Sequence, residues 1–166
     1  MKSPAPADDF KVGIVARETA ISVTGLTFLQ GILDRTYPAP PFAPTAGMWI
    51  VEAEHGRIVF EAEPSARFYN PMGTVHGGWL SMLIDSAMGC AVHSTLKAGQ
   101  AYTTIDMTVS FVRPVLENSG RLRCEGKLVH GGGRVATAEG RIWDAAAKLV
   151  AHGTETCMVM TVDRAS

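Results

Sequence analysis

The segment from Gly77 to Leu96 constrains the fold more than any other stretch, because apolar side chains occupy every side of the helix that it predicts. A helix that is apolar all round is a buried one. At a rise of ~1.5 Å per residue it would be ~30 Å long, about the diameter of a small domain. The sequence therefore predicts one central helix around which the rest of the chain packs. Its apolar residues are Trp79, Leu80, Met82, Leu83, Ile84, Ala87, Met88, Cys90, Ala91 and Val92.

One carboxylate, Asp85, is the only acidic, lysine or arginine side chain within this predicted helix. Burying an unpaired carboxylate is costly, so such a residue is usually paired, protonated or functional. His76, Gly77 and Gly78 stand where the helix begins, and a helix start presents unpaired N–H groups and the positive end of the dipole. Glycine there lets the backbone approach a ligand closely. The pattern thus places a site for an oxyanion and a buried acid on one helix.

Short alternating segments on both sides of the helix predict β-strands. Met48–Glu54 and Arg57–Glu63 are separated by His55-Gly56 and predict a hairpin, whose first strand would carry Trp49, Val51 and Ala53 on one face. Short turns make neighbouring strands antiparallel, so we expect one antiparallel sheet with one buried helix, an α+β layer fold. The strands expected after the helix are 103–111, 122–130, 135–143 and 149–160.

The chain divides into three parts. Residues 1–22 begin rich in Pro and Ala and predict a flexible tail. Residues 23–45 predict a short helix capped by Thr24, followed by a linker in which four prolines exclude regular structure. This helix would pack on the domain edge or, less commonly, cover a pocket. Residues 46–162 form the single globular domain.

Composition excludes several classes of function. With 166 residues the chain suits one domain, and a net charge of −1 without a basic run argues against a nucleic-acid surface. The three cysteines match no metal spacing and indicate a reducing compartment. The opening residues lack the apolar core of a signal peptide, and Asp85 argues against a membrane-spanning central helix. We therefore expect a cytoplasmic protein with no metal, cofactor, nucleic-acid or membrane partner.

The run N-P-M-G-T-V-H-G-G from Asn70 to Gly78, followed by Asp85, resembles the PaaI-like acyl-CoA thioesterases of the hotdog-fold superfamily. In that fold a curved antiparallel sheet wraps a long central helix, and the strand ending F-V-R-P fits it as well. The resemblance covers roughly Ala46–Met160. It implies an α+β hotdog domain that hydrolyses an acyl-CoA thioester to a free acid and coenzyme A.

The resemblance also implies roles for individual residues. Asp85 is the catalytic carboxylate, acting either as general base or as nucleophile. The backbone N–H of Gly77 binds the oxyanion that develops on the thioester carbonyl. Asn70 holds the substrate carbonyl or the attacking water. Thr104 assists the water, although a one-residue ambiguity leaves Thr103 open.

Further candidates have structural roles as alternatives. His76 and Gly78 flank the oxyanion donor and would contact the substrate, or His76 would simply orient the turn. Arg113 and Arg134 would bind the phosphates of coenzyme A, unless they cap sheet edges. Asp106 is a rival acid, but it falls on the polar face of a strand.

Two other functions are compatible with the fold. A hydratase or dehydratase acting on β-hydroxyacyl thioesters needs a His paired with an acid, whereas Asp85 stands at the thioesterase position. A non-catalytic acyl-CoA-binding module would normally carry a DNA-binding appendage, and the non-basic N-terminus offers none.

The acyl group and the assembly are also expectations. Aromatic and apolar residues around the motif, such as Tyr69 and Trp79, suggest a pocket for an aryl or medium-chain acyl group. The resemblance implies a homodimer, or a dimer of dimers, with sites at the subunit junction. Asn70 and Gly77 would come from one subunit, and Asp85 with Thr104 from the other.

Overall fold

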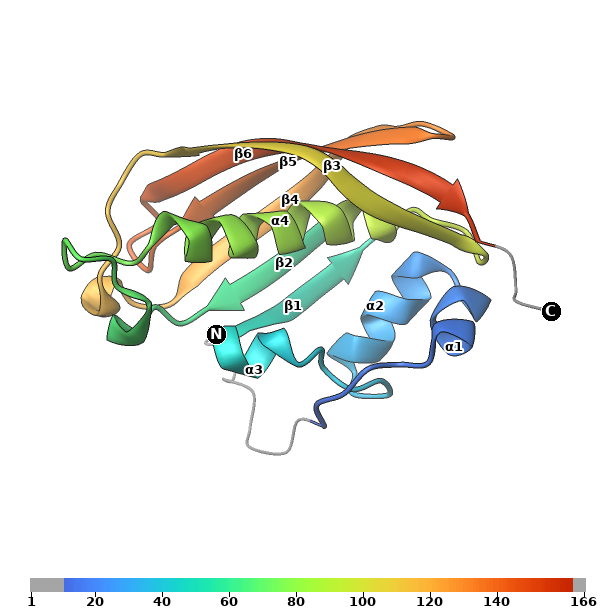
Figure 1. Cartoon of the computed structure of the whole chain (residues 1–166), viewed down its shortest axis with the longest axis horizontal. Helices are drawn as coiled ribbons and strands as arrows, with labels where there is room; N and C mark the ends of the chain where they lie inside the picture. The colour runs from blue at the N-terminus through green and yellow to red at the C-terminus, as the bar shows by residue number, and fades with distance from the viewer. Residues whose placement is uncertain (1–10, 163–166) are drawn as a thin grey trace.

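The computed structural model describes residues 11–162, in which a curved antiparallel sheet of six strands wraps around one long helix (Figure 1). The strands are β1 (Met48–Glu54), β2 (Arg57–Ala62), β3 (Gln100–Phe111), β4 (Leu122–Gly131), β5 (Val135–Trp143) and β6 (Leu149–Thr161). Their order across the sheet is β1-β2-β4-β5-β6-β3, with every neighbouring pair antiparallel. This confirms the predicted α+β hotdog fold.

The central helix, α4 (Gly77–His93), ends three residues before the predicted Leu96. The hydroxyl of Ser94 explains the early end: it donates to the Ala91 carbonyl at 2.7 Å and accepts the Gly56 N–H at 2.8 Å. A serine side chain that bonds to the backbone competes with the helical ladder. No helix within residues 11–162 combines the length and apolar character that crossing a membrane requires.

The helix rests directly on the backbone of the sheet. A Cβ atom added at Gly126 of β4 would lie 2.2 Å from the Ala87 carbonyl oxygen of α4. One added at Gly140 of β5 would lie 2.7 Å from Ile84 Cγ1. The two glycines therefore let α4 approach the sheet as closely as backbone allows, and this contact fixes the height of Asp85 above the strands.

The N-terminal helices lie below β1, on the far side from β6 (Figure 1). They are α1 (Arg17–Ser22), α2 (Gly25–Leu33) and α3 (Phe42–Ala46). Thr24 caps α2 as predicted, accepting the Thr27 N–H at 3.2 Å. Of the predicted flexible tail, residues 1–10 lie outside the described residues, and the remainder contains α1.

Helix α3 corrects the prediction that the proline-rich linker excludes regular structure. Its N-cap is Pro41 and Pro44 falls within its first turn. The N–H groups of a first turn have no intrahelical partner, so proline loses nothing there.

The prediction that Trp49, Val51 and Ala53 share one face of β1 is also wrong. Met48 and Ile50 are buried, whereas the Trp49 ring lies beneath the Arg121 guanidinium, 5.2 Å from the ring centroid. A β-bulge between Ile50 and Glu52 then shifts the register. A bulge inserts a residue that a strict period of two cannot anticipate.

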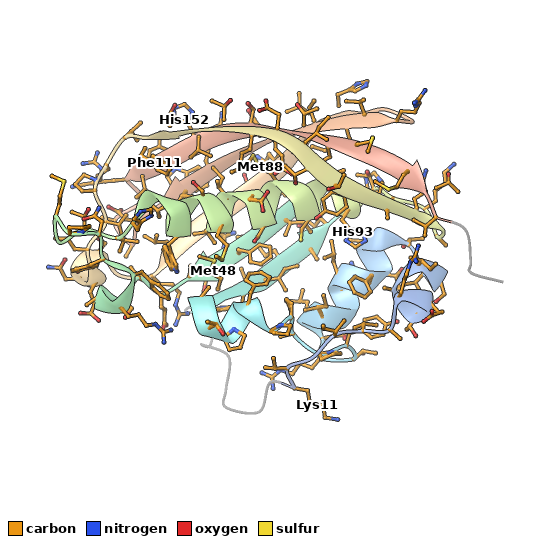
Figure 2. The ribbon with its side chains drawn as sticks, in the orientation of Figure 1. Lys11, Met48, Met88, His93, Phe111 and His152 are labelled. Atoms are coloured by element: carbon orange, nitrogen blue, oxygen red, sulfur yellow. The ribbon has the colours of Figure 1, made fainter. Side chains whose placement is uncertain are left out.

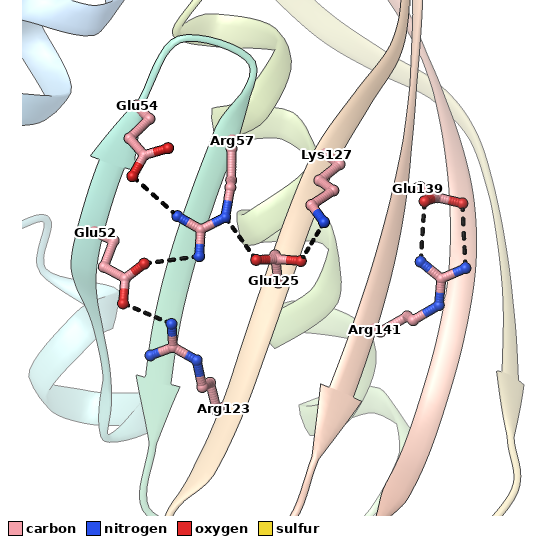
Figure 3. A network of polar contacts seen from close by, with 8 residues as sticks. All are labelled: Glu52, Glu54, Arg57, Arg123, Glu125, Lys127, Glu139 and Arg141. Atoms are coloured by element: carbon pink, nitrogen blue, oxygen red, sulfur yellow. Dashed lines mark hydrogen bonds and ion pairs between the residues drawn. The ribbon is translucent and has the colours of Figure 1, made fainter. Parts of the chain in front are cut away.

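The outer face of the sheet carries a network of ion pairs (Figure 3). Arg57 contacts Glu52 at 2.8 Å and Glu125 at 2.6 Å, and Arg123 reaches Glu52 at 2.6 Å. The hydrogen bond from Arg123 lowers the pKa of Glu52 below its usual value. Exposed pairs of this kind stabilise little, at about 0–1 kcal/mol each. These charged side chains make the outer face of the sheet polar, which favours packing of the opposite, apolar face against α4.

The other feature that positions the site is the free edge of β3. The strand order places β3 at one edge of the sheet. Ile105 on this strand is 59% exposed and Phe111 is 49% exposed. Exposed apolar edges are normally paired or protected.

The close contact between α4 and the sheet predicts that Gly126→Ala destabilises the protein by about 1–3 kcal/mol or more, because the methyl group meets helix backbone that cannot turn aside. Urea denaturation would measure the loss. Gly133→Ala is the matched control, because a Cβ there has no atom within 4 Å. Equal stability of the two variants would contradict this description of the core.

Candidate active site

The start of α4 is organised by His76. Its Nδ1 atom accepts the Gly78 N–H at 2.9 Å, which caps the helix. The Gly77 N–H has no hydrogen-bond partner among residues 11–162. Of the two glycine N–H groups, only that of Gly77 is therefore open to an incoming oxygen. His76 and Gly78 bond to each other, and their contact with a substrate stays a prediction.

Asn70 holds the loop that leads into the helix. Its Oδ1 accepts the N–H groups of Met72 at 2.9 Å and Thr74 at 3.3 Å, while its Nδ2 donates to the Thr74 hydroxyl at 2.9 Å. These bonds give Asn70 the turn-forming role that the sequence left open as an alternative. A direct contact with the substrate carbonyl stays a prediction.

A hollow of about 340 Å³ lies between this loop and the end of β3. Asn70, Gly77, Phe111 and Arg113 all line it. A Cβ atom at Gly77 would lie 3.2 Å from the Phe111 ring, so any larger residue would crowd the hollow. Arg113 donates from Nε to the Leu149 carbonyl at 3.3 Å. The oxyanion end of the helix and one of the two candidate arginines therefore share a hollow.

Asp85 lies further along α4, half-buried, with its Oδ1 3.4 Å from the Thr104 hydroxyl. Burial raises the pKa of Asp85, and the hydrogen bond from Thr104 opposes that rise. Of the two candidate threonines, Thr104 and not Thr103 reaches Asp85, and its action on the attacking water stays a prediction. The rival Asp106 is exposed, beyond a bulge that separates it from Thr104.

Glu155 on β6 was not predicted from the sequence as a site residue. Its Oε1 lies 2.7 Å from the Thr104 hydroxyl, so Thr104 stands between two acids. Burial, and the nearby charge of Asp85, raise the pKa of Glu155. Strand alternation could have found it, since Glu155 shares a face with Cys157 and Val159 rather than with the exposed residues between them.

Asp85 and Thr104 open into a second, apolar cavity of about 210 Å³. Helix α2 forms part of its cover, so the pocket-covering role that the sequence favoured less is present. Burial raises the pKa of Cys90 in this wall to about 12, so its thiol is not ionised at neutral pH. The principal apolar lining residues are Leu29, Ile32, Phe42, Phe60 and Tyr102.

The two hollows are separate within one chain. Gly77 and Asp85 are eight residues apart, which on a helix means ~12 Å along the axis. Phe111 lies near the start of α4 and His93 at the opposite end, towards α2 (Figure 2). Gly77 lines the first hollow and Asp85 lines the second, and neither hollow is lined by both.

The two candidate arginines also lie far apart. The Arg134 carbonyl accepts the Val159 N–H at 2.9 Å, whereas the Arg113 N–H donates to the Val150 carbonyl at 3.2 Å. Nine residues of β6 separate these partners, or ~30 Å. One subunit cannot bring both arginines to the same phosphate. No group of three or more His, Cys, Asp or Glu within residues 11–162 is placed to hold a metal ion.

Comparison with known proteins places the chain in a family. The model of the family described as the thioesterase superfamily matches residues 72–151. A relative from Halobacterium salinarum, provisionally named an esterase, is 42% identical over 69 residues, which cover 40% of this chain. That match spans only 44% of the relative's length.

Solved structures extend the similarity to most of the chain. A phenylacetic acid degradation-related protein from Ralstonia eutropha JMP134, provisionally named a thioesterase, has a TM-score of 0.72 and 31% identity, covering 78% of this chain and 98% of that one. The PaaI protein of the phenylacetic acid degradation operon of E. coli shares the fold, with a TM-score of 0.67 and 24% identity over 74% of this chain and 87% of its own. The chain therefore belongs to the thioesterase superfamily, as a PaaI-like hotdog thioesterase.

Proposed function

We propose that this protein hydrolyses an acyl-CoA thioester to a free acid and coenzyme A. The observation that carries the proposal is the position of Asp85 and Thr104 in the wall of an apolar cavity, on the helix that the motif begins. Thioester hydrolysis needs a proton acceptor or nucleophile, an attacking water and a stabilised tetrahedral oxygen. Asp85 supplies the first, Thr104 orients the second and the free Gly77 N–H stabilises the third.

The raised pKa of Asp85 suits either role that the sequence left open. Burial makes its carboxylate a stronger base and a less solvated nucleophile than an exposed aspartate. The Gly77 N–H stands at the positive end of α4, where a developing negative charge is favoured. The hydratase alternative gains no support, because His76 uses its Nδ1 to cap the helix.

The second cavity supports an aryl or medium-chain acyl group. A dry cavity of ~150 Å³ can hold benzene, so about 210 Å³ suits an aromatic ring with a short linker, or a medium aliphatic chain. Its walls include the aromatic rings of Phe42, Phe60 and Tyr102, which favour an apolar or aromatic guest. A long-chain acyl group would exceed this space.

The division of the site between two hollows supports a composite site in a homodimer. An isologous pair of β3 edges would cover the exposed Ile105 and Phe111. We place the two-fold axis between Met107 and Thr108. The midpoint between Thr104 and Phe111 along β3 lies at the same place, so Thr104 would face the partner's Phe111. Because Phe111 contacts Gly77 in its own subunit, this register brings the partner's oxyanion end towards Asp85.

The same register would bring a candidate arginine from each subunit towards one site. Tyr102 would face the partner's Arg113, and Tyr102 pairs in its own sheet with Val159, whose N–H bonds to Arg134. Two arginines at this end would suit the phosphates of coenzyme A. The pairing of such dimers into a tetramer stays a prediction from the resemblance.

A thiol-release assay on a panel of acyl-CoA esters tests the activity. We expect turnover of phenylacetyl-CoA or hexanoyl-CoA in preference to palmitoyl-CoA. Asp85→Asn should lower kcat by at least ~10²-fold, because it removes the acid–base or nucleophilic group while keeping its shape. Asp106→Asn, the matched control at an exposed acid, should keep its activity. Near-native hydrolysis by folded Asp85→Asn protein would show that the reaction does not use this residue.

The proposed interface predicts that Ile105→Glu converts the dimer to monomers and lowers thioesterase activity, because pairing would bury an uncompensated charge. Sedimentation velocity measures the mass of the assembly. Val129→Glu is the control, since Val129 is 64% exposed on β4, which β5 and β6 separate from β3. A dimer that survives Ile105→Glu with full activity would place the interface elsewhere.

A further inference from the structure

Glu155 is a buried acid for which the proposed reaction has so far no use. Only 1% of its surface is exposed, and it is the sole buried Asp, Glu, Lys or Arg among residues 11–162. Its Oε1 lies 2.7 Å from the Thr104 hydroxyl and 3.0 Å from the Cys157 sulfur. Its Oε2 has no hydrogen-bond partner in the described part of the chain. A buried polar atom left in this way needs an explanation.

The surroundings of Glu155 disfavour a negative charge. The ionisable groups that face it are all acids: Asp85 and Cys90 from α4, Tyr102 from β3 and Cys157 from β6. The residue paired with it on β5 is Ala138. An ionised carboxylate needs a cation or several donors to offset its lost hydration. No cation faces Glu155 within residues 11–162, and only the Thr104 hydroxyl and the weakly donating Cys157 thiol lie within hydrogen-bond distance of it. These surroundings favour the protonated form of Glu155 while Asp85 is ionised.

The position of that proton decides where the Thr104 hydroxyl can point. The Thr104 hydroxyl has one hydrogen to donate. Its oxygen lies 2.7 Å from Glu155 Oε1 and 3.4 Å from Asp85 Oδ1. An ionised Glu155 would take this hydrogen, because it is the nearer acceptor. A protonated Glu155 instead donates to the Thr104 oxygen, and the Thr104 hydrogen is then free to point to Asp85 or to water beside it.

We propose that Glu155 is a positioning residue for the hydrolysis: as a neutral acid it donates to Thr104 and so fixes the Thr104 hydroxyl as a donor towards Asp85 and the attacking water. This inference rests on the proposed thioesterase activity. Glu155 acts through Thr104 and does not touch the substrate. The net result is a chain of two hydrogen bonds that ends on the carboxylate at which the reaction occurs.

Two substitutions at position 155 separate this role from mere packing. In Glu155→Gln the side-chain amide can still donate to Thr104, so kcat should stay within ~3-fold of the wild-type value. That change is smaller than the effect expected from the loss of one hydrogen bond. In Glu155→Leu the donor is gone, and kcat should fall at least ~10-fold, the equivalent of one hydrogen bond to a charged network, with KM little changed. Cys157→Ala removes the other contact of Oε1 and should leave kcat nearly unaltered.

The pH profile supplies a readout that packing would not move. The protonated form of Glu155 is the active one. Wild-type kcat should therefore be highest below the pKa of Glu155 and fall as the pH rises through that pKa. Glu155→Gln cannot lose this proton and should lack that alkaline limb. The infrared carbonyl band of a protonated carboxylic acid should also be present in the wild type at neutral pH and absent from Glu155→Gln.

The outcomes distinguish this inference from the proposed function. Loss of activity in Asp85→Asn together with wild-type kcat and pH profile in folded Glu155→Leu would overturn the role of Glu155 alone. Absence of the infrared band from the wild type would overturn it too, whether or not Glu155→Leu folds. Full activity in Asp85→Asn would remove the proposed function itself.

Discussion

The contact between α4 and the backbone of β4 and β5 determines where every candidate catalytic group lies. Gly126 and Gly140 leave no side chain between helix and sheet, so the helix cannot shift outwards without opening the core. That contact fixes the start of the helix beside the end of β3 and fixes Asp85 above the middle of the sheet. The Gly77 N–H and Asp85 are thus held by one rigid element, although they line different hollows.

A second constraint follows from burying acids beside one another. Asp85 and Glu155 both have raised pKa values, because both are withdrawn from water, and the charge of Asp85 raises the pKa of Glu155 further. Thr104 lies between them and contacts both. In the proposed mechanism the two carboxyl groups divide their roles, one ionised and reactive, the other neutral and donating. The apolar cavity next to them both raises the pKa of Asp85 and provides space for an acyl group, so that the same burial would serve chemistry and binding.

Much of this arrangement could be predicted from local pattern. The central helix around Asp85, the capping residue Thr24 and the alternation of β5 and β6 each depend on neighbours in sequence, and the structure confirms them. The bulge in β1 and helix α3 were mispredicted, because one depends on an inserted residue and the other on where proline falls within a turn. Glu155 was overlooked because its partner Thr104 is 51 residues away and meets it only across two paired strands. The cavity beneath α2 likewise depends on packing between distant segments.

The central claim is that each active site combines Asp85 of one subunit with the Asn70–Gly77 loop of the other, and subunit mixing tests it directly. Homodimers of Asp85→Asn or of Asn70→Ala carry a defect in both sites, whereas a mixed dimer gathers both defects into one site and leaves the other intact. Random pairing after co-refolding makes roughly half the dimers mixed, so about a quarter of wild-type activity should return. Activity no higher than the average of the unmixed variants, with subunit exchange verified by mass spectrometry, would contradict the account and place each site within one chain.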